Sequence, residues 1–331
     1  MLNNHITFPS TCNRSKTFDI IADCKKELIQ KIRADRTYKM PKNYITWETL
    51  SIISAICLET SNLEYARVAI STFIHSHRFA LWFCHNAPLY CLTPELLEAL
   101  DHTDSLHKPG IFTGWQPSLP SFLVALPRHI IFTPDGAEFD YILIACGSAD
   151  KPQWNSGRWR DIEIPSYTTE HHHFQWTTVD SKETVWMSGT TINENELVYE
   201  QHSDIGKSNL TSDDKVFIQR IRNLVVNLLL TLEYSPALLS DVVVGDTTSE
   251  HGFGKPLAQP SKRIASTRKV RYPRWLGKNY QPPSPLTTTT GTHASPQSHW
   301  RRGHWRILES GEGRRWKESK RLWIEPILVN S

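Results

Sequence analysis

The stretch SDDKVFIQRIRNLVVNLLLTLEYSP, residues 212–236, decides the expected fold. Its apolar residues recur at the spacing of one helix face, Ser212 is a suitable N-cap, and Pro236 ends the pattern. Seven apolar positions share that face: Phe217, Ile221, Leu224, Val225, Leu228, Leu229 and Leu232. A stripe of this length has to be buried against another element, so the stretch predicts a long amphipathic helix packed on a sheet.

The residues before this helix predict the sheet. From Trp115 onward, short β-rich runs alternate with turn residues, which is typical of an antiparallel meander rather than a βαβ sheet. Residues 129–132 and 138–145 form one expected hairpin around the turn TPDG, in which Gly136 can adopt a positive φ. Residues 173–178 and 184–187 form a second. We therefore predict an α+β body over residues 113–254, with an antiparallel β-meander covered by the long helix.

Residues 1–112 form a mainly helical N-terminal part by the same spacing argument. One apolar stripe starts at Phe18, Thr46 is a suitable N-cap for a second helix, and a third helix is expected from about Leu63 to Trp82. Thr93 followed by Pro94 is a strong start for a short helix, because proline at the first helical position gives up an amide that would have no partner there.

The net charge of +3 conceals a strong asymmetry along the chain. Residues 255–331 carry 16 Lys and Arg against 4 Asp and Glu, whereas residues 1–254 carry 21 against 30. Such a division points to a basic module for polyanions joined to an acidic body. Within the basic part we distinguish a basic segment with a Pro/Thr/Ser-rich linker, 255–298, and a basic C-terminal β-hairpin, 299–331, on that flexible tether.

Neither a secretory signal nor a membrane span is expected. The first thirty residues lack an apolar run with a cleavage site, and the apolar stretch 225–232 is far shorter than the ~18 residues that cross a bilayer. We expect a cytoplasmic protein with free thiols. The six cysteines lack paired CxxC spacing, so a zinc site is disfavoured, and we predict no metal and no cofactor. The ligands of such a site would be Cys84, His85 and Cys91 with His75 or His77.

The sharpest local feature is the run HWRRGHWR, residues 299–306. Arginine side chains suit phosphate oxygens, indole faces stack on bases, and glycine allows a close backbone approach. These properties predict nucleic-acid or ribosome contact, assigned to Arg301, Arg302, Gly303, His304, Trp305, Arg306, Arg314 and Arg315. The alternative is that the tryptophans fill the hairpin's own small core while the basic residues keep it soluble.

His304 is the one candidate for catalysis. An imidazole can act as general acid or base in metal-independent RNA cleavage, and neighbouring arginines would stabilise the phosphorane. Equally, His304 can be a hydrogen-bonding residue that holds the turn. No second catalytic group can be placed beside it from the sequence, so we assign no catalytic residue and expect a protein that is not an enzyme.

The C-terminal residues carry a family resemblance. The pattern HxRRGHW at 299–305, then GxG at 311–313, WxxP at 323–326 and Val329-Asn330, resembles the terminal signature of a family found on phages, plasmids and other mobile genetic elements. Its characterised member is a type V-A anti-CRISPR protein that lowers production of the CRISPR effector nuclease. Weaker similarity extends upstream through residues 119–123 and 233–236, and the N-terminal third is the least similar part.

This resemblance implies translation-dependent downregulation. The protein would bind the nascent N-terminal peptide of a type V CRISPR nuclease and cause loss of the mRNA being translated, while the basic tail contacts ribosome or mRNA. The position of the peptide-binding site is not predicted. Two alternatives remain: a metal-independent ribonuclease that uses His304, and a basic-tailed nucleic-acid-binding protein of a mobile element that has no peptide target.

Overall fold

The computed structural model describes residues 71–72, 75, 78–79, 82, 87–105, 110–112, 115, 119, 121–148, 172–193, 196–199, 210–243, 273–284, 286–287, 299–308 and 319–330. The helices predicted from Phe18 and from Thr46 lie outside the described residues, as do Arg314 and Arg315. Of the third predicted helix, the described positions between Ser71 and Trp82 are helical.

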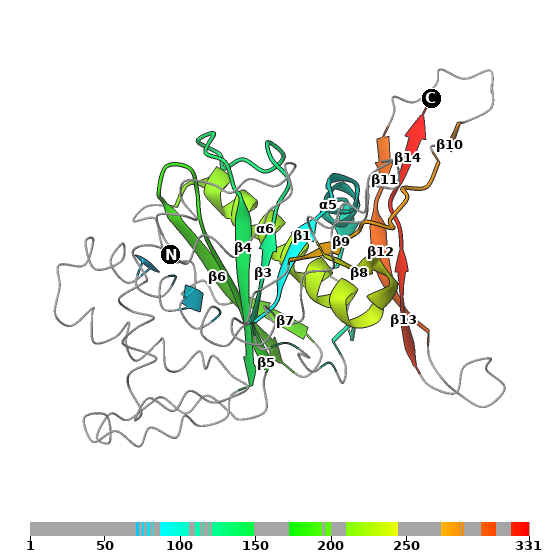
Figure 1. Ribbon diagram of the computed structural model, residues 1–331, viewed down its shortest axis with the longest axis horizontal. Coiled ribbons are helices and arrows are strands. Elements are labelled where there is room, and N and C mark those ends of the chain that lie inside the picture. Colours follow the sequence, from blue (N-terminus) through cyan, green and yellow to red (C-terminus); the bar gives the residue numbers. More distant parts are fainter. Residues whose placement is uncertain are drawn as a thin grey trace, which may run out of the picture.

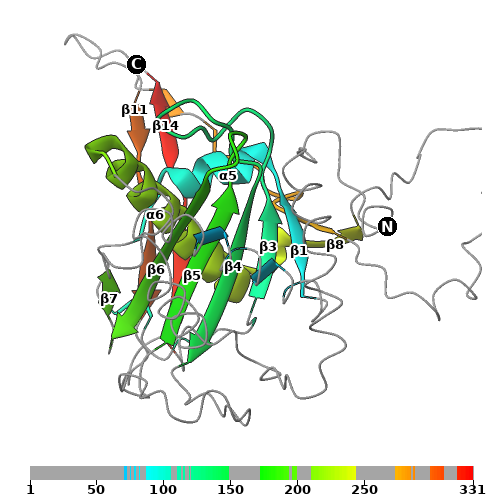
Figure 2. The same ribbon diagram turned by 90° about the vertical axis from the view of Figure 1, so that its left-hand side faces the viewer.

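The described elements form three layers (Figure 1). The first layer is an eight-stranded sheet in the order β7-β6-β5-β4-β3-β1-β9-β8. The helices α5 (Pro94–Asp101) and α6 (Ser212–Tyr234) form the middle layer, and strands from the C-terminus form the third. Figure 2 shows α6 crossing the strands of the large sheet at an angle. The α+β class and the long helix are therefore confirmed.

Five consecutive strands of the large sheet form the predicted antiparallel meander. They are β3 (Ser121–Ala125), β4 (Tyr141–Ser148), β5 (His172–Val179), β6 (Val185–Asn193) and β7 (Glu196–Tyr199). The second predicted hairpin is β5–β6, with Thr177 opposite Met187. The first is reduced to a single bridge between Phe132 and Glu138, although Gly136 has the expected positive φ of 77°.

Strand β1 (Leu89–Leu92) lies in the part predicted to be mainly helical, and it extends the sheet beyond the antiparallel meander by pairing in parallel with both β3 and β9 (Arg274–Leu276). Parallel neighbours need a crossover connection, and α5 lies in the connection from β1 to β3. Thr93 caps this helix as expected, accepting a hydrogen bond from the Leu96 amide. All four β1 residues are buried, which fits a central strand and explains why no alternation marked it in the sequence.

The predicted boundary at residue 254 does not end the large sheet. Strand β9 comes from the basic segment and lies between β1 and the edge strand β8 (Leu239–Val243), with which it pairs antiparallel. A short 3-10 helix, Pro236–Leu238, joins α6 to β8. The basic segment therefore contributes to the core of the body.

Helix α6 is buried on more than the one predicted face. Its N-cap is Thr211, not Ser212: the Thr211 hydroxyl accepts from the Asp214 amide, and the Asp214 carboxylate accepts from the Thr211 amide. On the sheet side, the Phe217 ring lies 5.2 Å from that of Phe139. Its other side faces the C-terminal strands, and residues 221–231 are buried nearly all round, as expected of a helix between two layers, whereas the first turns keep an exposed side.

The C-terminal strands form one two-stranded antiparallel arm, which we call the C-terminal ribbon (residues 299–308 and 320–330). Strand β12 (Gly303–Leu308) pairs with β13 (Lys320–Ile324), and β11 (His299–Arg301) pairs with β14 (Ile327–Asn330) in the same continuous register. The ladder breaks beside Pro326, which has no amide hydrogen to donate.

The ribbon is not a separate module on a tether. Strand β12 also pairs in parallel with β2 (Thr103–Asp104), and β14 pairs with β10 (Leu286–Thr287), which falls within the predicted linker. The expectation of an independent tail is corrected by these pairings. Linker residues 288–298 lie outside the described part.

Candidate interaction surface on the C-terminal ribbon

Trp305 anchors the ribbon to the body. Its side chain is 1% exposed and belongs to the main hydrophobic core, and its indole Nε1–H donates to Asn227 Oδ1 at 3.1 Å. The Trp323 ring stacks beside it at 6.3 Å between centroids. Burying a tryptophan with its N–H satisfied contributes strongly to stability, so this contact fixes the ribbon on α6.

Position 303 requires glycine because neighbouring atoms leave no room for a side chain. A Cβ atom there would lie 2.6 Å from Thr103 Oγ1, 2.7 Å from Pro326 Cδ and 2.9 Å from the carbonyl oxygen of Ile324. The Gly303 amide donates to the carbonyl of His102 at 3.0 Å. The glycine of the signature thus permits close approach between two segments of this protein.

Two asparagines of α6, which the sequence did not single out, join the helix to β2, and Asn227 also joins it to the ribbon through Trp305. Asn227 Nδ2 donates to the carbonyls of Leu100 (2.9 Å) and Thr103 (2.8 Å), and Asn223 Nδ2 donates to the Thr103 carbonyl (2.6 Å). A signal for Asn227 was present, because it is an amide in the middle of an apolar helix, where a buried polar group needs partners.

Arg321 also faces the body. Its guanidinium lies 4.7 Å from the centroid of the Tyr234 ring, and its Nε donates to the Ile111 carbonyl at 2.7 Å. Trp323 Nε1 donates to Thr103 Oγ1 at 3.1 Å. One face of β12–β13, formed by Trp305, Ile307, Arg321 and Trp323, is therefore committed to intramolecular packing. We call it the inner face.

Arg301, Arg302 and Arg306 are exposed. Within the described part of the chain, the side chain of none of the three makes a hydrogen bond or ion pair with another residue. Trp300 is half-buried because its ring stacks on that of His102, with centroids 4.5 Å apart. These arginines are the part of the sequence-predicted contact set that the structure places within reach of a partner.

The prediction that Gly303 and Trp305 contact nucleic acid needs correction, because the body buries both residues. A base cannot reach an indole face that packs against Asn227 and Trp323. The alternative reading, in which tryptophans fill a core, fits better, with the difference that the core belongs to the whole body rather than to the hairpin alone.

His304 is half-buried, and its neighbours across the strands are Ile324 and Asp104. Adjacent positions in parallel strands place side chains on the same face of the sheet, so Asp104 is a carboxylate near His304. This arrangement provides an ordinary environment for a surface histidine, and we assign it no catalytic role.

Within the described part of the chain, no group of His, Cys, Asp and Glu side chains gathers as a metal site would require. No described helix combines the length and apolar character needed to cross a bilayer. Cys91 and Cys146 are buried and form no disulfide, and burial raises the pKa of the Cys146 thiol to about 12. That thiol is therefore protonated and unreactive near neutral pH.

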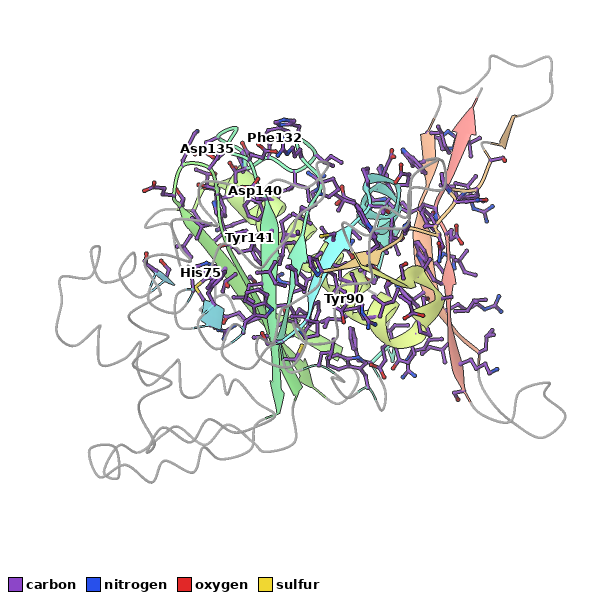
Figure 3. All side chains as sticks on the ribbon, in the orientation of Figure 1. His75, Tyr90, Phe132, Asp135, Asp140 and Tyr141 are labelled. Atoms are coloured by element: carbon purple, nitrogen blue, oxygen red, sulfur yellow. The ribbon has the colours of Figure 1, made fainter. Side chains whose placement is uncertain are left out.

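A buried polar contact lies on the opposite face of the large sheet. His75 Nε2 is 2.8 Å from the Tyr141 hydroxyl, and His75 Nδ1 is 3.0 Å from Thr177 Oγ1 (Figure 3). Burial raises the pKa of Tyr141 well above its ordinary value. Both imidazole nitrogens and the phenol thus have partners, and we interpret the contact as structural.

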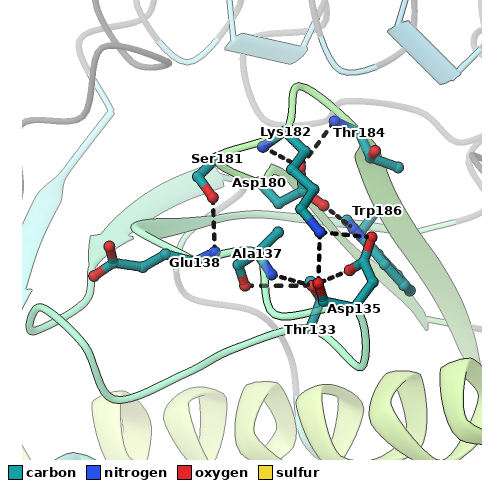
Figure 4. Close-up of polar contacts among 9 residues, drawn as sticks. All are labelled: Thr133, Asp135, Ala137, Glu138, Asp180, Ser181, Lys182, Thr184 and Trp186. Atoms are coloured by element: carbon teal, nitrogen blue, oxygen red, sulfur yellow. Dashed lines mark hydrogen bonds and ion pairs between the residues drawn. The ribbon is translucent and has the colours of Figure 1, made fainter.

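Two turns at one end of the sheet are tied together by polar contacts (Figure 4). Lys182 forms an ion pair with Asp135 at 3.4 Å, and the Glu138 amide donates to Ser181 Oγ at 2.9 Å. Asp180 Oδ2 accepts from Trp186 Nε1 at 2.7 Å. The labelled Phe132 and Asp135 lie at this end in Figure 3, where charges of both signs are mixed.

The comparisons with known proteins agree with the signature in the ribbon. A family model described as AcrVA2-like, Anti-CRISPR type V subtype A2 family, matches residues 90–331. No curated protein matches the chain. A solved structure described as the crystal structure of AcrVA2 is 15% identical over 95% of this chain and 96% of that chain, with a TM-score of 0.40. The predicted resemblance is confirmed at the level of the family: the chain belongs to the anti-CRISPR type V subtype A2 family.

Proposed function

We propose that this protein lowers production of a type V CRISPR nuclease while the nuclease is being translated. It recognises the nascent N-terminal peptide, and the mRNA under translation is then lost in the cytoplasm. The observation that carries the proposal is the family match over residues 90–331, which includes the ribbon, α6 and most of the large sheet.

The charge distribution supports such a role. Residues 1–254 are acidic and residues 255–331 are basic, so one part suits a basic peptide and the other suits the polyanionic surroundings of the ribosome. The exposed Arg301, Arg302 and Arg306 are the candidates for contact with ribosome or mRNA.

A reporter pair tests peptide dependence. One reporter carries the N-terminal codons of the nuclease in frame, and its matched control carries nearly the same RNA shifted by one nucleotide, so that it encodes another peptide. We expect reporter mRNA to fall only for the in-frame fusion. Equal loss of both mRNAs would refute peptide recognition and favour a nucleic-acid-binding protein without a peptide target.

A charge reversal tests the ribbon in the same assay. The double variant R301E/R302E should weaken association with ribosomes and reduce the loss of mRNA. The control R128E/K278E reverses two exposed charges elsewhere and should retain both properties. If the two double variants behave alike, the ribbon arginines have no special role.

His304→Ala separates this function from the ribonuclease alternative. We expect mRNA loss to continue, because host nucleases then degrade the message. Abolished loss of mRNA in a variant that still folds and still binds ribosomes would instead favour catalysis by His304.

A further inference from the structure

The face of β12–β13 opposite the inner face has a mixed basic and apolar character. Side chains alternate between the two faces of a strand, so the residues between the inward-facing ones point outward. The register places Arg306 opposite Leu322 and Leu308 opposite Lys320. The pair His304 and Ile324 lies on the same side, and we call the four residues Arg306, Leu308, Lys320 and Leu322 the outer face.

Leu322 is the unusual member of this face. It is 47% exposed and is one of four large hydrophobic residues exposed within the described part of the chain. Its cross-strand neighbour Arg306 and its same-face neighbour Lys320 are both exposed. An exposed leucine between two cations combines apolar contact with attraction for carboxylates.

Strand β13 is also an edge. Its small sheet has the order β13-β12-β2, and within the described residues β13 pairs with β12 alone. An edge strand offers N–H and C=O groups to another extended chain. By contrast, β14 is flanked on both sides, by β11 and by β10.

We propose that the outer face and the β13 edge bind an extended, acidic protein segment that adds to the small sheet as a further strand. Main-chain hydrogen bonds to β13 would hold the segment, its carboxylates would meet Arg306 and Lys320, and an apolar residue would cover Leu322. This inference goes beyond the proposed function and does not depend on the identity of the nuclease peptide.

The composition of the outer face favours protein over nucleic acid. Single-stranded nucleic acid binds by stacking bases on aromatic faces, whereas the indoles of Trp305 and Trp323 are on the inner face. An aliphatic leucine offers nothing to a phosphate. Arginine beside an apolar residue is common at protein–protein interfaces.

Fluorescence anisotropy of the full chain with short labelled probes tests the proposal. The probes are a peptide with the repeat Glu-Thr-Val-Thr, whose Glu and Val side chains share one face of an extended chain (the Glu/Val peptide), its Lys/Val counterpart, the Glu/Val peptide with alternate amides methylated, and single-stranded RNA. We expect the Glu/Val peptide to bind at least about tenfold more tightly than either peptide control, because one control lacks the charge and the other lacks the amide donors.

Two substitutions locate the binding. Leu322→Gln and Arg306→Glu should each weaken Glu/Val binding by about tenfold, whereas Arg128→Glu, on the exposed loop after β3, should not. Buried-tryptophan fluorescence checks that each variant is folded.

Tighter binding of RNA than of the Glu/Val peptide, or Glu/Val binding that neither ribbon variant changes, would overturn the proposal. No preference over the Lys/Val peptide would mean that Lys320 and Arg306 only protect an edge strand from aggregation. Because no probe contains nuclease sequence, this experiment and the reporter assay can fail independently.

Discussion

The inner and outer faces of the C-terminal ribbon are made by the same short strands, yet the inner face is packed against the body and the outer face is exposed. Trp305 is 1% exposed and hydrogen-bonded to α6, whereas Arg306, the next residue, is exposed. On β13, Arg321 lies over Tyr234 while Leu322 is 47% exposed. Residue type alone does not decide which side chains are buried, because an arginine lies on the inner face and a leucine on the outer one. The alternation of side chains along a strand and the position of α6 decide it.

The largest expected effect is on the inner face. Trp305→Ala should lower the free energy of unfolding by about 3–5 kcal/mol, because it leaves a cavity and removes the indole from Asn227. Urea denaturation measures the loss. Arg306→Ala is the matched control, and a loss of similar size there would contradict the assignment of the two faces.

Asn227→Ala should cost about 2–3 kcal/mol, since it leaves the Trp305 N–H without its acceptor and removes one hydrogen bond from each of the Leu100 and Thr103 carbonyls. Combining it with Trp305→Phe tests the link directly. If the hydrogen bond matters, the double variant loses less stability than the two single losses added together. Strict additivity would show that the asparagine and the indole act separately.

Gly303→Ala should cost about 1–3 kcal/mol, because the new methyl group would overlap atoms of Thr103, Pro326 and Ile324. Gly136→Ala is a useful comparison. Gly136 has a positive φ of 77° but no atom within 4 Å of an added Cβ, so its cost arises from the backbone alone. Thermal unfolding of both variants separates crowding from strain, and an unchanged midpoint for Gly303→Ala would refute the close packing.

Strongly alkaline pH should weaken the packing of the inner face against the body, because two tyrosines beside that face would ionise. Burial raises the pKa of Tyr234 and of Tyr280, whose ring lies 5.7 Å from Trp323. Unfolded tyrosines ionise near pH 10. The stability that comes from burying the two neutral phenols is therefore fully present below pH 10 and is lost as the pH rises through their higher folded-state pKa values. Tryptophan fluorescence against pH should show the loss, and Tyr234→Phe should reduce it. A transition that falls below pH 10 would exclude this cause.

The smallest effect on stability is expected on the outer face. Leu322→Gln should change the free energy of unfolding by no more than about 0.5 kcal/mol, because the side chain is already largely in water. Denaturation by urea beside the anisotropy assay would show binding and stability changing independently. A loss of several kcal/mol would mean that Leu322 belongs to the core.

Local signals predicted much of the fold. Thr93-Pro94 begins α5, the apolar spacing of residues 217–232 lies within α6, and the β5–β6 hairpin forms where alternation and turn residues indicated it. Each depends on neighbours in the sequence. Strand β1 was missed because a strand buried on both faces has no alternation, and β9 was missed because three residues in a basic segment are too few to detect.

The candidate site was predicted only in part. The run 299–306 was selected from the sequence as a contact site, and of its members the side chains of Arg301, Arg302 and Arg306 are exposed. The burial of Trp305 depends on Asn227, which lies 78 residues away in the sequence and accepts its N–H. The need for glycine at position 303 depends on the close approach of Thr103. No local pattern contains such a distant partner.

By itself, therefore, the sequence determined the long helix, the division of charge and the family signature, since each is a property of residue order or composition. Only the tertiary structure decided which half of the signature packs and which half is exposed. A strand has two faces with the same backbone, and the layer that lies against one of them determines which side chains are removed from water.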